Sequence, residues 1–398
     1  MTNSGSDHFP GQIDVDLAAI RHNLRTLQQR ARGSQLMAVV KADAYGHGRG
    51  PVALAAYEAG VRWFGVSQVN EALKLVAELT GAGVRDARVF AWLAAPNQDW
   101  EAALSAGLHL SASSTFTLES IAAAAQTLAL TAPIHLKVDV GMGRGGARGD
   151  DFAHLALVAA RLEAEGLITV EGIWSHLPEA DDITEAGHET MAGQVARFER
   201  ALAQAREAGL EPELRHLAAT SGTLWYPETH YDLVRVGIGM YGLSPNPQVA
   251  SSADLNLRPA LSLGAPVILV KRLPAGAGVS YGATWRAERP HWVGLVPLGY
   301  ADGIPRHGSN SAPVTVQTVD GPFLSQILGR VCMDQVVISL GEGDEPAARV
   351  GDWAVLIGSG PGEPSADEWA RACGTINYEI VTRLAPTISR HYHQEDQP

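Results

Sequence analysis

The sequence predicts an α/β protein with an N-terminal (β/α)8 barrel followed by a mostly β C-terminal domain. Its 398 residues are more than one compact core usually serves, so we expect two domains. Up to about residue 240, short apolar runs alternate with longer segments of helical periodicity, whereas short β-type runs with proline and glycine punctuation begin at Pro245. We therefore assign residues 1–244 to the barrel and residues 245–398 to the β domain.

Eight strand-like runs define the predicted barrel, and each is followed by a helical segment or an equivalent turn. Eight such units in about 230 residues favour a closed barrel over the main alternative, a doubly wound open sheet. The strand-like runs are residues 36–42, 63–67, 88–93, 107–111, 133–140, 168–176, 213–218 and 233–240, and the clearest helical segments are residues 70–79, 115–129, 151–166 and 185–209.

The C-terminal domain shows five short β-type runs and one late amphipathic segment, residues 366–385, that predicts a single helix. No internal repeat of about 20–50 residues interrupts either domain. The β-type runs are residues 265–272, 292–297, 313–319, 335–340 and 353–358.

Composition and charge exclude several classes of protein. The net charge of −13 argues against a nucleic-acid partner, because a phosphate-binding surface needs a basic footprint. The two cysteines, Cys332 and Cys373, form no CxxC motif, so we expect neither a disulfide framework nor a metal site. Residues 1–12 are polar and lack the apolar core of a signal peptide, and no apolar run approaches the length that spans a bilayer. We expect a cytoplasmic protein with no membrane partner.

Lys41 stands at the end of the first strand-like run, where active-site residues of barrels are found. Loss of hydration disfavours a charged ammonium there, and the resulting fall in pKa makes a lysine amine a nucleophile or Schiff-base former. A strand-end lysine can also simply extend its ammonium into water. The residue alone leaves both interpretations open.

The segment that begins at Lys41, KADAYGHG, resembles the cofactor-lysine segment of the alanine racemase family. Six further segments match the family in the same order, so the resemblance covers essentially the whole chain. It implies a pyridoxal 5′-phosphate (PLP) enzyme that interconverts L-alanine and D-alanine and supplies D-alanine for peptidoglycan. The further segments are residues 138–144 (VDVGMGR), 234–242 (VRVGIGMYG), 279–285 (VSYGATW), 299–303 (GYADG), 332–334 (CMD) and 376–379 (INYE).

The resemblance also implies a role for individual residues. Lys41 carries PLP and acts as one base, and Tyr281 is the second base on the opposite face of the substrate. His176 and Arg235 form the hydrogen-bonded chain that promotes the action of Tyr281. The implied cofactor-binding residues are Lys41, Tyr45, His176, Ser221, Arg235, Gly237, Ile238 and Tyr378, and the substrate carboxylate is held by Arg144 and the backbone of Met333.

Strand alternation supports the position of Arg235 independently. If Val234 and Val236 pack outward on helices, Arg235 points into the barrel, where a guanidinium needs an acceptor. The family implies that this acceptor is the pyridine nitrogen of PLP, which stays unprotonated because arginine keeps its protons. A buried arginine–carboxylate pair is the alternative.

His135, Lys137 and Asp139 share one face of a predicted barrel strand. By resemblance, Lys137 is the lysine that is often carbamylated in this family, where its new negative charge supports Arg144. An inward Lys137 paired with Asp139 explains the pattern equally well, and the sequence does not choose between them.

Some features depart from the family or suggest other functions. The family commonly has asparagine at the position of Thr220, and residues 177–179 differ from its usual pattern, so substrate breadth is open. The alternatives are a broader-specificity amino-acid racemase, a barrel-type decarboxylase and a non-catalytic PLP-binding regulatory protein. Two GxGxxG matches, at residues 141–146 and 237–242, lie too far along the chain, or in the wrong context, for a dinucleotide site.

The family also implies a homodimer with shared active sites. Lys41 and Tyr281 lie about 240 residues apart, in different predicted domains. A two-fold arrangement would let each β domain reach the barrel of the other subunit.

Overall fold

The structure is a computed structural model that describes residues 11–394, and the chain divides into two compact units. The barrel unit comprises residues 20–44 and 49–257. The β unit comprises residues 11–19, 45–48 and 258–394. The domain boundary between residues 244 and 245 stays a prediction, and the units are described separately below.

The barrel unit contains eight parallel strands in the order β8-β7-β6-β5-β4-β3-β2-β9, with β9 pairing with β2. Two backbone hydrogen bonds connect the ends of this sheet, from Asp232 N to Arg215 O (3.1 Å) and from Arg235 N to Ala218 O (3.0 Å). The predicted (β/α)8 barrel is confirmed. Its strands are β2 (Gln35–Val39), β3 (Trp63–Gln68), β4 (Arg88–Leu93), β5 (His109–Ala112), β6 (Ala132–Lys137), β7 (Ile168–Trp174), β8 (Leu214–His216) and β9 (Leu233–Val236).

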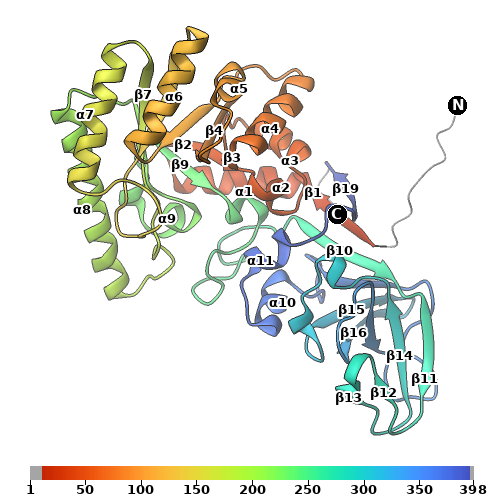
Figure 1. The fold of residues 1–398 in the computed structure, drawn as a ribbon. Helices are drawn as coiled ribbons and strands as arrows, with labels where there is room; N and C mark the ends of the chain where they lie inside the picture. The colour runs from red at the N-terminus through yellow and green to blue at the C-terminus, as the bar shows by residue number, and fades with distance from the viewer. Residues whose placement is uncertain (1–10, 395–398) are drawn as a thin grey trace, which may run out of the picture. The chain divides into compact units, whose positions relative to one another are not determined.

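Helices α3 to α8 lie around the outside of the barrel strands (Figure 1). Local caps fix where several of them begin: the Ser114 hydroxyl accepts a hydrogen bond from Thr117 N, and the Thr184 hydroxyl accepts one from Gly187 N. The helices are α1 (Leu17–Arg30), α3 (Arg49–Glu58), α4 (Val69–Gly81), α5 (Trp100–Ser105), α6 (Thr115–Leu128), α7 (Asp150–Ala164), α8 (Glu185–Glu207) and α9 (Thr220–Trp225).

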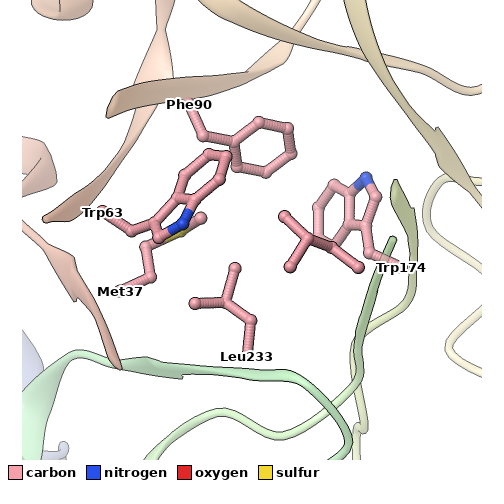
Figure 2. Packing of buried hydrophobic residues seen from close by; sticks show 6 residues of the cluster. Met37, Trp63, Phe90, Trp174 and Leu233 are labelled. Carbon is pink, nitrogen blue, oxygen red and sulfur yellow. The ribbon is translucent and has the colours of Figure 1, made fainter. Parts of the chain in front are cut away.

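Large side chains fill the barrel interior. Met37, Trp63, Phe90, Trp174 and Leu233 come from five different strands and point toward one another (Figure 2). Each is almost completely buried, and burial of a side chain of this size stabilises the fold by about 1.5–3 kcal/mol. This apolar packing holds the strands whose carboxyl ends carry the candidate site.

The β unit is built on a nine-stranded sheet in the order β11-β14-β17-β16-β15-β18-β10-β1-β19. The first strand pairs antiparallel with β10 and parallel with the last strand, so the two ends of the described chain lie in one sheet. The mostly β C-terminal domain is confirmed. The strands are β1 (Gln12–Asp16), β10 (Leu261–Pro266), β11 (Leu269–Leu273), β14 (His291–Val296), β15 (Pro313–Thr318), β16 (Gly321–Leu328), β17 (Val336–Ser339), β18 (Trp353–Ile357) and β19 (Ser389–His393), with a separate pair, β12 (Gly278–Val279) and β13 (Trp285–Arg286).

The single helix predicted for residues 366–385 is wrong. The structure has two helices, α10 (Ala366–Cys373) and α11 (Asn377–Thr382). Gly374 ends α10 with a left-handed conformation (φ 65°), which glycine adopts without steric cost. Among residues 11–394, no helix combines the length and apolar character needed to cross a membrane.

Candidate active site

The segment that begins at Lys41 leaves β2 in an unusual conformation. Helix α2 (Lys41–Tyr45) is left-handed: Ala42, Asp43 and Ala44 have φ of 51–53° and ψ of 49–51°, and Tyr45 has φ of 54°. For an L-residue this conformation costs about 1–2 kcal/mol, because Cβ approaches the following carbonyl oxygen. Strain of this kind persists only where surrounding contacts enforce it, and it concentrates at functional sites.

Three hydrogen bonds within the barrel unit hold the left-handed turn. Ala42 N donates to Glu71 Oε1 (2.7 Å), Ala44 N donates to Val40 O (3.0 Å), and Arg49 N donates to Asp43 Oδ1 (2.9 Å). The backbone that follows Lys41 is therefore tied to α4, to α3 and to Val40, the residue after β2.

The environment of Lys41 favours the neutral amine. Burial lowers the pKa of Lys41, and the Arg144 guanidinium lowers it further, while Glu71 opposes them. Its Nζ also lies 5.8 Å from the centre of the Trp92 ring. A lysine with a lowered pKa is the type that reacts with an aldehyde, so this position fits the cofactor link implied by the sequence.

Arg235 projects from β9 into the barrel and is 4% exposed. Its NH2 donates to Ser175 O (2.6 Å) and Leu217 O (3.0 Å), and its NH1 donates to His216 O (2.9 Å). No carboxylate within residues 11–394 lies in ion-pair distance, so the alternative of a buried arginine–carboxylate pair is not observed. The Nε–H has no hydrogen-bond acceptor among these residues. The hydrogen bonds of Arg235 use only its two terminal nitrogens, so the Nε–H can serve a ligand acceptor such as a pyridine nitrogen.

His176 follows β7 and lies beside Arg235, with 3.4 Å between His176 Nδ1 and Arg235 NH2. Burial, together with Arg235 and Arg144, lowers the pKa of His176 to about 3, so the ring is neutral near pH 7. A guanidinium can only donate, so His176 Nδ1 accepts and its proton lies on Nε2. His176 therefore presents an N–H donor on the side away from Arg235.

Thr220 connects the two loops predicted to hold the cofactor phosphate. Its buried hydroxyl oxygen accepts hydrogen bonds from Gly237 N (3.1 Å) and Gly239 N (3.4 Å). The N–H groups of Ser221 in α9 and of Ile238, the first residue of the 3-10 helix η2 (Ile238–Tyr241), have no intrahelical acceptor. Two helix starts joined in this way suit an anion. The sequence placed Thr220 in a loop of small residues that suits an anion, and also marked it as a departure from the family.

Lys137 ends β6 and is 9% exposed, with its Nζ 4.5 Å from the centre of the Trp174 ring. Burial, followed by Arg144 and Arg235, lowers its pKa to about 8. The ion pair with Asp139, one of two explanations for this residue, is not observed within residues 11–394. Asp139 instead accepts hydrogen bonds from the backbone of the loop at Gly141–Gly143.

The remaining predicted site residues belong to the β unit. Tyr45 and Tyr378 lie together, with ring centroids 6.3 Å apart, and burial raises the pKa of Tyr45. Tyr281 begins the 3-10 helix η3 (Tyr281–Ala283) and is 71% exposed, and Met333 is 52% exposed. The barrel unit thus holds Lys41, Arg144, His176, Ser221, Arg235, Gly237 and Ile238, and the β unit holds Tyr45, Tyr281, Met333 and Tyr378.

Comparison with known proteins covers both units. The model of the alanine racemase N-terminal domain matches residues 15–245, and that of the C-terminal domain matches residues 260–392. The chain is 48% identical to the alanine racemase of Streptomyces coelicolor over 96% of each chain, and 48% identical to that of Frankia casuarinae over 95% of each.

The chain belongs to the alanine racemase family. The solved alanine racemase from Streptomyces coelicolor superposes with a TM-score of 0.91 at 46% identity, covering 97% of this chain and 98% of that one. A Bartonella henselae alanine racemase with covalently bound pyridoxal phosphate gives 0.83 at 28% identity, covering 96% and 99%. The predicted family, the predicted alanine racemase activity and the PLP cofactor are confirmed.

Proposed function

We propose that this alanine racemase interconverts L- and D-alanine with Lys41 and Tyr281 as its two acid–base groups. The observation that carries the proposal is the environment of Lys41. It begins α2, two residues after the end of β2, and its pKa is lowered; it lies in the same unit as Arg144 and Arg235. Such an amine can hold the aldehyde of the cofactor and, once released by substrate, can exchange a proton at Cα.

The residues present fit PLP. The free Nε–H of Arg235 suits the ring nitrogen, and the phosphate is assigned to the loops joined by Thr220, at Ser221, Gly237 and Ile238, together with Tyr45 and Tyr378. When bound, PLP withdraws electrons from the substrate and acidifies its Cα–H. Arg235 keeps its charge at neutral pH, because burial lowers its pKa only to about 9. It therefore does not pass a proton to the ring nitrogen.

The protein groups divide the proton transfers between them. Racemisation removes a proton from one face of Cα and delivers another to the opposite face. Lys41 serves one face and the Tyr281 hydroxyl serves the other. The neutral His176 ring, held by Arg235, offers its Nε2–H to the oxygen of Tyr281 and stabilises it after it has lost its proton. Arg144 and the backbone of Met333 hold the substrate carboxylate.

We also propose a homodimer whose active sites combine Lys41 of one subunit with Tyr281 of the other. Tyr281 and Met333 are both exposed in the single chain, and the side chains of the residues before them, Ser280 and Cys332, lie 3.0 Å apart, which supports a common interaction surface there. Inactive Lys41→Ala and Tyr281→Phe chains should regain activity when mixed, because each heterodimer then has one site without a lesion. If the mixture stays inactive while mass spectrometry shows heterodimers, the shared site is refuted.

Substrate breadth decides between this enzyme and a broader amino-acid racemase. An assay coupled to D-amino-acid oxidase with L-alanine, L-serine, L-lysine and L-arginine should give turnover with L-alanine far above the others. Comparable turnover of several substrates would favour the broader enzyme, and no turnover would favour a PLP-binding regulatory protein. We place the protein in the cytoplasm, where its D-alanine supplies peptidoglycan synthesis.

A further inference from the structure

A line of polar side chains crosses the barrel interior and ends at Arg235. His216 Nδ1 lies 3.2 Å from Arg235 NH1, and His216 Nε2 lies 2.8 Å from His135 Nδ1. At the other end, His135 Nε2 faces Glu171 Oε2 at 3.9 Å, and His109 Nδ1 lies 2.7 Å from the same oxygen. The side chains of His135 and His216 are fully buried, yet neither belongs to the site described above.

The Arg235 end of this line fixes the direction of its hydrogen bonds. A guanidinium only donates, so His216 Nδ1 accepts from Arg235. Burial holds the pKa of both histidines well below the ordinary value, so each ring carries one proton. The proton of His216 is therefore on Nε2 and is donated to His135 Nδ1, which leaves the proton of His135 on Nε2, facing Glu171. At 3.9 Å the Glu171 carboxylate lies beyond hydrogen-bond distance of His135 Nε2, but its negative charge favours a proton on that nitrogen, in the same direction.

We infer that Glu171, His135 and His216 are positioning residues for Arg235. Both imidazole rings turn a lone pair toward the guanidinium, and Glu171 supplies the negative charge at the far end. Arg235 has no carboxylate of its own within residues 11–394, so these oriented rings compensate its buried charge and hold its orientation. The catalytic consequence rests on the cofactor-binding role proposed for Arg235 above.

The same atoms could be taken for a metal site. His109 Nδ1, His135 Nε2 and a Glu171 oxygen lie within 4.8 Å of one another, and two histidines with one carboxylate form a known ligand set for transition metals. A metal would need the lone pair of His135 Nε2. The proton would then move to His135 Nδ1, and His216 would have to accept it at Nε2 and turn an Nδ1–H toward Arg235. Two donors would oppose each other at 3.2 Å. The arrangement therefore favours the hydrogen-bonded line from His135 through His216 to Arg235, which we call the relay, over a metal.

Nuclear magnetic resonance of the 15N-histidine-labelled holoenzyme tests the direction itself. Long-range couplings from ring hydrogens to ring nitrogens distinguish the two neutral tautomers, and the spectra of His135→Gln and His216→Gln assign the signals. We expect both rings to be neutral with the proton on Nε2 at pH 7. An Nδ1 proton or a doubly protonated ring at either position, or stoichiometric zinc or iron that is lost in Glu171→Gln, would overturn the relay.

Paired substitutions test its effect on Arg235. His216→Leu removes both hydrogen bonds and should lower kcat about tenfold and shift the absorption band of bound PLP, since a hydrogen bond to a charged group is lost. His216→Gln can accept from Arg235 and donate to His135, so it should recover most of both losses. His230→Leu is the matched control, because it replaces another buried histidine, whose Nε2 donates to the Thr223 carbonyl and not to Arg235.

The outcomes separate the relay from the proposed cofactor site. If His216→Leu behaves like His230→Leu, or if His216→Gln is as impaired as His216→Leu, the positioning role is refuted. If the tautomers are as expected but Arg235→Glu leaves the PLP spectrum and turnover unchanged, the hydrogen-bond direction from Arg235 through His216 to His135 is still confirmed. The role of Arg235 toward PLP is then the part that fails.

Discussion

Replacing Ala42 with glycine should stabilise the protein, although the same replacement usually destabilises a helix. Ala42 stands in the left-handed turn after Lys41, with φ of 51° and ψ of 51°, and its side chain is exposed. Glycine adopts this conformation freely, so the substitution removes about 1–2 kcal/mol of strain. Its greater freedom in the unfolded chain returns about 0.4–1 kcal/mol. The net gain should be about 0.5–1 kcal/mol.

The substitution of Ala42 by glycine should change the backbone strain and little else. The hydrogen bond to Glu71 comes from the backbone N–H, which glycine keeps, and the exposed methyl group adds little packing. Ala123 provides the matched control: it is exposed inside the right-handed helix α6, where a change to glycine should cost about 1 kcal/mol.

Urea unfolding of the PLP-free enzyme, followed by far-ultraviolet circular dichroism, compares the two variants at equal protein concentration. The midpoint should rise for Ala42→Gly and fall for Ala123→Gly. A fall of similar size in both would show that the turn stores no strain. Because the strain lies next to Lys41, we also expect a severalfold lower kcat for Ala42→Gly, as the lysine backbone becomes less rigid.

Three further predictions concern pH and direction of reaction. Three buried histidines, His135, His176 and His216, have folded-state pKa values below the ordinary value of about 6.5, so the unfolded chain takes up protons first as pH falls. The free energy of unfolding should therefore drop below pH 6.5 by about 1.4 kcal/mol per pH unit for each ring. A urea midpoint that is constant between pH 6.5 and 5.5 would contradict this. Lys137, with its pKa lowered to about 8, should make the enzyme more stable by up to about 3 kcal/mol as pH rises from 8 to 10.5, and Lys137→Met should lose this rise. Tyr281→Phe should slow deuterium uptake at Cα from solvent far more with one alanine enantiomer than with the other, and equal slowing would refute the two-base assignment.

Periodicity predicted the barrel well because its strands are apolar and its helices are long. The run at residues 88–93 coincides with β4 (Arg88–Leu93), and the helix expected at residues 185–209 is α8 (Glu185–Glu207). The strands β1 and β19 were missed. Each is five residues long; β1 (QIDVD) is polar at alternate positions and β19 (SRHYH) is polar at nearly every position. Long-range pairing makes them strands, of β1 with β10 and of β19 with β1.

The site was predictable where a residue type reveals its chemistry, and not where its role depends on neighbours. A lysine at a strand end and an arginine between valines stand out in the sequence. The left-handed turn at residues 42–45 does not, because Ala42 and Ala44 prefer right-handed helices. The other hand is held by hydrogen bonds that the Glu71 and Asp43 carboxylates and the Val40 carbonyl accept. The histidine line is hidden for the same reason, since His135 and His216 lie 81 residues apart.

The charges of the barrel unit indicate why it needs an anionic ligand. Lys41, Lys137 and Arg235 all have lowered pKa values, and burial is the first cause for each. Arg144 lowers the pKa of both lysines further, so these groups repel one another in a poorly hydrated site. A bound phosphate and a substrate carboxylate would offset that repulsion and favour the charged forms again. PLP should therefore stabilise the barrel through charge as well as contact. Inorganic phosphate alone should raise the urea midpoint of the PLP-free enzyme, and the rise should shrink at high salt because screening weakens the attraction. A midpoint insensitive to phosphate would show that the cationic cluster is already compensated within the protein.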